Sequence, residues 1–121
     1  MMEKETIYLF SYNHTVKGLI EDAGYDVYSL VECPSSIPQG SVVVYDRYTS
    51  KSTGDDLLKA DFPVIILDDY QQDFVIQKFI NKPARAYMLV DEFEEELDIA
   101  ITAVRSGSVF VSNIIENGVA V

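Results

Sequence analysis

The chain alternates short, almost wholly apolar runs with longer stretches in which apolar residues recur at helical spacing. Five runs have the length and the β-branched or aromatic content of buried strands, and a polar or acidic residue follows each of them. These runs are Thr6–Phe10, Tyr25–Val31, Ser41–Tyr45, Pro63–Leu67 and Ala86–Val90. Buried strands that alternate with amphipathic helices form open parallel sheets, so the pattern predicts an α/β fold with both faces of the sheet covered.

Four stretches between or after these runs have the composition of helices. In the first, apolar residues recur at i, i+3, i+4 and i+7 from Val16, and Asn13 or Thr15 can cap its amino end. The expected helices follow the first strand up to Gly24, span Asp55–Ala60, run from Asp69 or Gln71 to before Pro83, and cover Glu92–Ser106.

Residues 32–40 (ECPSSIPQG) interrupt this alternation. Their two prolines, two serines and one glycine are typical of a loop. A crossover between parallel strands usually carries a helix. We therefore expect one face of the sheet to be thinly covered at this point.

The acidic strand ends are the first candidates for a functional site, because ligands of open parallel sheets bind outside the carboxyl ends of the strands. The acids Asp46, Asp68, Asp69 and Asp91 either converge there as a cation site or a pocket with raised pKa values, or are solvated and cap the helices that follow. Capping accounts for Asp69 and Asp91 without further assumptions, which favours the second interpretation.

Composition narrows the classes of function. The 121 residues suit one domain, and the net charge of −11 opposes direct binding to nucleic acid phosphates. Cys33 is the only cysteine, so an internal disulfide and a CxxC motif are both excluded. No apolar run reaches the roughly 18 residues that cross a membrane, and the charged start lacks a secretory apolar segment. These features predict a cytoplasmic protein with no membrane contact.

Three further candidates have simpler explanations. His14 lies in the first loop without a nucleophile nearby in the pattern, which favours a surface residue. Cys33 stands beside Pro34 and is interpreted as a small, partly buried side chain. The string Lys51-Ser52-Thr53 lacks the preceding glycines of a phosphate-binding loop.

Three segments resemble the receiver domains of two-component response regulators: Gly40–Asp46, Pro63–Leu67 and Ala86–Leu97. The stretch Ile99–Ser112 is similar to the last helix and exit of receivers that precede a helix-turn-helix DNA-binding domain. The resemblance implies a flavodoxin-like, three-layer fold with a five-stranded parallel sheet in the order 2-1-3-4-5, here with the helix between strands 2 and 3 reduced or absent. It assigns residues 1–107 to the receiver-like domain and 108–121 to a tail or a linker.

The same resemblance implies a degenerate phosphorylation site. Asp46 stands at the phosphoacceptor position, but Tyr12 and Asn13 replace the acid pair that holds Mg²⁺. Asp68 replaces the hydroxyl residue and Val90 the lysine. Phosphoryl transfer needs both Mg²⁺ and the lysine, because negative charge develops on the phosphoryl oxygens. We therefore expect no resident metal, no cofactor and no enzymatic activity. Tyrosines near this edge can fill the vacated space, although strand propensity explains them as well: Tyr12, Tyr45, Tyr48, Tyr70 and Tyr87.

These expectations together describe a phosphorylation-independent regulatory module of signal transduction or transcription control. It would act as a homodimer or by docking a protein partner, and DNA contact would come only through a further domain. The apolar face of the helix before Pro83 is the candidate interface: Phe74, Val75, Ile76, Phe79 and Ile80. Two alternatives stay open, a weak phosphoacceptor that uses Asp46 and a small-ligand sensor that uses the thinly covered face.

Overall fold

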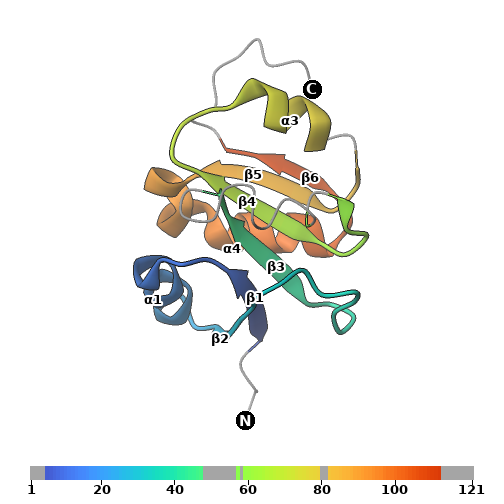
Figure 1. Cartoon of the computed structure of the whole chain (residues 1–121). Coiled ribbons are helices and arrows are strands. Elements are labelled where there is room, and N and C mark those ends of the chain that lie inside the picture. Colours follow the sequence, from blue (N-terminus) through green and yellow to red (C-terminus); the bar gives the residue numbers. More distant parts are fainter. Residues whose placement is uncertain (1–4, 48–56, 58, 80–81, 113–121) are drawn as a thin grey trace.

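The computed structural model describes residues 5–47, 57, 59–79 and 82–112, whose strands form one parallel sheet (Figure 1). The strand order is β2-β1-β3-β4-β5-β6. The strands are β1 Thr6–Phe10, β2 Asp26–Ser29, β3 Val42–Asp46, β4 Val64–Asp68, β5 Arg85–Leu89 and β6 Val109–Val111. The first five have the predicted order 2-1-3-4-5, so the flavodoxin-like α/β fold is confirmed.

The sixth strand corrects the predicted count of five. Val109–Val111 pairs in parallel with β5, with Val109 opposite Arg85 and Val111 opposite Tyr87. Gly107, at a φ of +85°, ends the preceding helix and turns the chain back toward the sheet. A run of three apolar residues inside an apolar tail has no period that would separate it from that tail, so the sequence pattern did not reveal this strand.

The helices are α1 His14–Asp22, α3 Asp73–Phe79 and α4 Phe93–Arg105, with a short 3₁₀ turn η2 at Val90–Glu92. The Asn13 side chain caps α1 by accepting a hydrogen bond from the Thr15 amide at 2.8 Å. Helix α3 begins later than predicted, because the chain bends after β4 before the helix starts. Most of the helix expected at residues 55–60 lies outside the described residues.

Helices lie on both faces of the sheet (Figure 1), and each face carries an apolar cluster. On one face, α1 and α4 bury Val16, Ile20, Leu97 and Ile101 against the strands. On the other face, α3 and the loop between β2 and β3 contact a second cluster that includes Tyr87. The prediction that both faces of the sheet are covered is therefore confirmed.

Residues 30–41 connect β2 to β3 without a helix, as the composition of that segment predicted. Leu30, Cys33 and Ile37 from this loop are partly buried against the second cluster. Three side chains of an irregular loop cover less apolar surface than a crossover helix would. The strand residues on this face are nevertheless fully buried, among them Val43, Tyr45, Val64 and Ile66.

Candidate functional site

The carboxyl ends of β3 and β4 hold two buried carboxylates. Asp46 ends β3 and Asp68 ends β4, and neither side chain has any exposed surface. The Ser11 hydroxyl donates a hydrogen bond to Asp46 Oδ2 at 2.7 Å. The same Ser11 oxygen accepts a hydrogen bond from the Asn13 amide at 2.9 Å. Asp46 is thereby linked to the turn that leads into α1.

Asp68 is bound by a cation and by a phenol. Arg47 Nη1 donates to both carboxylate oxygens of Asp68, at 2.9 and 3.1 Å, and only 6% of Arg47 is exposed. The Tyr87 hydroxyl donates to Asp68 Oδ2 at 2.5 Å. We call these three residues the Asp68 network. A carboxylate removed from water needs such compensation, since an uncompensated buried charge is strongly destabilising.

Tyr87 also supports the turn after β4. Its hydroxyl oxygen accepts a hydrogen bond from the Gln72 amide at 3.0 Å, just before α3 begins. Burial raises the pKa of Tyr87, and the hydrogen bond to Asp68 and the negative charge of that carboxylate raise it further. Tyr87 therefore remains a neutral phenol that donates a hydrogen bond to Asp68. The network ties together the end of β4, the middle of β5 and the start of α3.

The backbone of Tyr87 also bonds to the residue that follows the edge strand β6. Its carbonyl oxygen accepts a hydrogen bond from the Ser112 amide at 3.0 Å. The Ser112 hydroxyl donates to Glu96 on α4, and both residues are almost fully buried. Residue 112, where the described part of the chain ends, is thus held by both β5 and α4.

The other predicted site residues lie outside the Asp68 network. Tyr12 is 65% exposed and contacts the Phe10 ring, whereas Asn13 serves as the α1 cap. Val90 begins the 3₁₀ turn and packs against the cluster on the α1 and α4 face. Asp69 and Asp91 are exposed, so the four acids named from the sequence do not form one cluster. The described residues contain no group of three or more His, Cys, Asp or Glu side chains placed to hold a metal ion.

The sequence interpretation missed Arg47 and Ser11. Arg47 reads as the start of a polar loop, and periodicity does not indicate where the side chain after a strand end points. One signal was available, because a buried Asp68 requires a cation and Arg47 directly follows the neighbouring strand. Tyr87 was among the tyrosines proposed to fill this space, and its ring lies in the core with its hydroxyl at Asp68.

The candidate interface on α3 is largely core. Val75, Ile76 and Phe79 are buried against the sheet, and Ile80 lies outside the described residues. Phe74 is 64% exposed. The interface prediction for this helix therefore narrows, among the residues that the structure describes, to Phe74.

The parallel sheet, its order and the two covered faces define an open α/β fold of the flavodoxin-like class. The fold is similar to that of the regulatory domain of the master biofilm regulator CsgD, with a TM-score of 0.59 and 14% sequence identity. The match covers 90% of this chain and 92% of that one. At this identity the likeness concerns the fold.

Sequence comparisons add nothing to that result. No protein-family model matches the chain, and no curated protein matches it. Within the described ranges, no helix has both the length and the apolar character needed to cross a membrane.

Proposed function

We propose that this chain is a regulatory module of signal transduction or transcription control whose state does not depend on phosphorylation of Asp46. The Asp68 network is the observation that carries the proposal. Where a phosphoacceptor site needs cations directed at the incoming phosphoryl group, Arg47 Nη1 is bound to both oxygens of Asp68. The Asp68 carboxylate also adds a negative charge that opposes a phosphoryl dianion at the neighbouring strand end.

The surroundings of Asp46 support the same proposal. Its side chain has no exposed surface, and Ser11 occupies one of its oxygens with a hydrogen bond. Mg²⁺ needs near-octahedral oxygen ligands, whereas Asn13, at the position of one expected metal ligand, uses its side-chain oxygen to cap α1. Phosphorylation of Asp46 at Oδ2 would compete with the hydrogen bond from Ser11.

The module would act by association, as a homodimer or with a protein partner. Two-fold dimers are the commonest assemblies of such chains, and an exposed aromatic ring is a typical interface anchor. Phe74 on α3 is such a ring. The net charge of −11 directs the proposal toward protein contacts and away from nucleic acid.

A thermal melt tests the phosphorylation-independent state. The melting temperature is measured with Mg²⁺ and beryllofluoride, which mimics an aspartyl phosphate, and with Mg²⁺ alone. A ligand that binds only the folded protein raises its melting temperature, so a working phosphoacceptor would melt higher. We expect beryllofluoride to leave the melting temperature of the wild type unchanged, and likewise that of Asp46→Asn.

The matched control is Asp69→Asn, which removes an exposed carboxylate next to the same edge of the sheet. An upward shift in the wild type and in Asp69→Asn that disappears in Asp46→Asn would overturn the proposal. That outcome would make Asp46 a functioning phosphoacceptor.

A further inference from the structure

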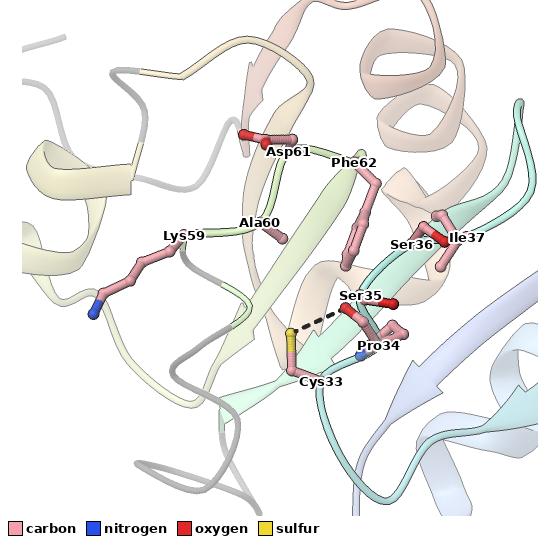
Figure 2. Close-up of a pocket in the computed structure, with 9 residues that line it drawn as sticks. All are labelled: Cys33, Pro34, Ser35, Ser36, Ile37, Lys59, Ala60, Asp61 and Phe62. Atoms are coloured by element: carbon pink, nitrogen blue, oxygen red, sulfur yellow. Dashed lines mark hydrogen bonds between the residues drawn. The ribbon is translucent and has the colours of Figure 1, made fainter.

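A cleft of about 470 Å³ opens on the thinly covered face of the sheet. Two segments line it, residues 33–37 of the helix-free loop and residues 59–62 before β4 (Figure 2). Its lining residues include neither Asp46 nor any member of the Asp68 network, which stand at the carboxyl ends of β3 and β4 and beside them. The cleft is therefore separate from the Asp68 network, and it exists because a loop replaces the crossover helix.

Apolar groups form the inner walls of this cleft. Cys33, Ile37, Ala60 and Phe62 are half-buried and pack against the second apolar cluster of the core. Figure 2 shows the Phe62 ring directed toward the loop that carries Ser35. A cavity of this kind is bounded by core residues on its inner side and opens to solvent on the other.

Polar groups make up nearly as much of the cleft lining as apolar groups, and the two charged side chains balance. Ser35 and Ser36 are exposed, and each offers a hydroxyl group. Lys59 and Asp61 are exposed and of opposite sign, and Figure 2 shows both side chains extending away from the loop. The lining thus favours an uncharged molecule.

Hydrogen bonds from Arg85 and Lys82 fix the wall of the cleft that residues 59–62 form. Arg85 is 1% exposed and donates hydrogen bonds to the carbonyl oxygens of Ala60 and Phe62, the latter at 2.7 Å. The Arg85 guanidinium also lies 5.0 Å from the centre of the Phe79 ring. Lys82 Nζ donates to the carbonyl oxygen of Lys59 at 2.9 Å. Because three carbonyls of this segment are anchored, the cleft is formed before any ligand binds.

We propose that this cleft binds a small, uncharged molecule that has an apolar face for Ile37 and Phe62 and a hydroxyl, carbonyl or N–H group that bonds to Ser35 or Ser36. Its volume of about 470 Å³ lies within the range of about 300–1,000 Å³ that is usual for small-molecule sites. The proposal concerns a second site, so its failure would leave the proposed role of the Asp68 network unaffected.

The test compares three aromatic probes of similar size with the whole chain by ¹H–¹⁵N NMR titration: neutral indole, anionic benzoate and cationic benzylamine. We expect indole to shift the amide signals of residues 33–37 and 59–62 saturably, with a dissociation constant on the order of 1 mM, as suits so small a probe. Benzoate and benzylamine should bind at least about tenfold more weakly, because the lining offers no unbalanced charge.

Two variants of the same loop localise the binding. Ser35→Trp places a large ring at the mouth of the cleft and should abolish the indole shifts. Gln39→Trp changes an exposed position of the loop that does not line the cleft, and should retain them. The absence of saturable shifts with indole in the wild type, equal binding of all three probes, or unchanged binding in Ser35→Trp would each overturn the proposal.

The Cys33 thiol gives an independent readout. Saturating indole should slow the alkylation of Cys33 by N-ethylmaleimide at least about threefold, because the thiol lines the cleft. A thiol placed on the exposed end of α4, by Ser106→Cys in a Cys33→Ser background, should react at the same rate with and without indole. Unprotected Cys33 under conditions in which the NMR shifts are saturated would contradict the placement of the ligand.

Discussion

Asp68 shows how one buried charge organises its neighbours at the scale of single residues. Its carboxylate has no contact with solvent and depends on Arg47 and Tyr87 for compensation. The sequence allowed Asp46 and Asp68 to be placed at neighbouring strand ends, because strand ends can be read from the apolar runs. It did not allow Arg47 to be placed, since the direction of a long side chain beyond a strand end depends on tertiary packing.

Replacement of Arg47 by methionine should lower the free energy of unfolding by about 3–5 kcal/mol, because Asp68 would stay buried without the guanidinium. The double variant with Asp68→Leu should lose less than the sum of the two single variants, because the two charges leave together. Urea unfolding measures both values. Arg105→Met, which breaks an exposed ion pair with Glu5, is the control and should cost no more than about 1 kcal/mol. Equal losses in Arg47→Met and Arg105→Met would contradict the role given to the network.

Stability should fall as the pH rises above about 10, the ordinary pKa of tyrosine. Burial, with the hydrogen bond to Asp98 as a second cause, raises the pKa of Tyr25 to about 12, and burial raises that of Tyr87 as well. Above pH 10 the unfolded chain loses tyrosine protons that the folded chain keeps. The stabilisation from Tyr25 is therefore complete below pH 10 and is lost as the pH passes through about 12.

The measurement is the urea midpoint between about pH 8 and pH 11. Tyr25→Phe and Tyr87→Phe should each flatten its decline with pH, whereas Tyr28→Phe, at an exposed position, should leave the slope unchanged. A slope that is identical in all four proteins would show that these tyrosines do not cause the decline.

At the scale of elements, the strands β1 to β5 and the helix-free loop follow from apolar runs and from the Pro- and Ser-rich segment. Strand β6 does not, because its three residues carry no period and its place depends on Gly107 turning the chain onto β5. Helix α3 was predicted in part: its existence follows from the sequence, but the exposure of its individual residues does not. Its apolar run predicts a helix, but the run alone does not distinguish residues that face the sheet from one that faces solvent.

A pair of phenylalanines on α3 separates these two roles. Phe79→Ala should destabilise the fold by about 3–5 kcal/mol, because its ring is buried in the second cluster and contacts Arg85. Phe74→Ala should change the free energy of unfolding by no more than about 0.5 kcal/mol, as is usual for an exposed position. If α3 is the association surface, Phe74→Ala should also shift the sedimentation coefficient toward that of a monomer. A self-association that survives Phe74→Ala would direct attention to another face.

At the scale of the whole molecule, the parallel sheet has two regions of different character. The carboxyl ends of β3 and β4 hold a buried ionic network, and the face beside the helix-free loop holds a cleft with a mixed polar and apolar lining. The alternation of elements predicted a parallel sheet, and the resemblance to receiver domains implied the order of its strands, but neither indicated this contrast. It depends on which side chains cross between neighbouring strands and on how much surface a bare loop leaves open.

Arg85 has a consequence for how this arrangement could vary among related chains. Its two terminal nitrogens bond to two carbonyls while its plane lies near the Phe79 ring, a combination that the single ammonium group of lysine cannot reproduce. An arginine at the first position of the fifth strand and a helix-free, proline-bearing loop thus form a paired signature. We expect homologous sequences that retain such a loop to retain this arginine, and those that regain a crossover helix to vary freely at that position.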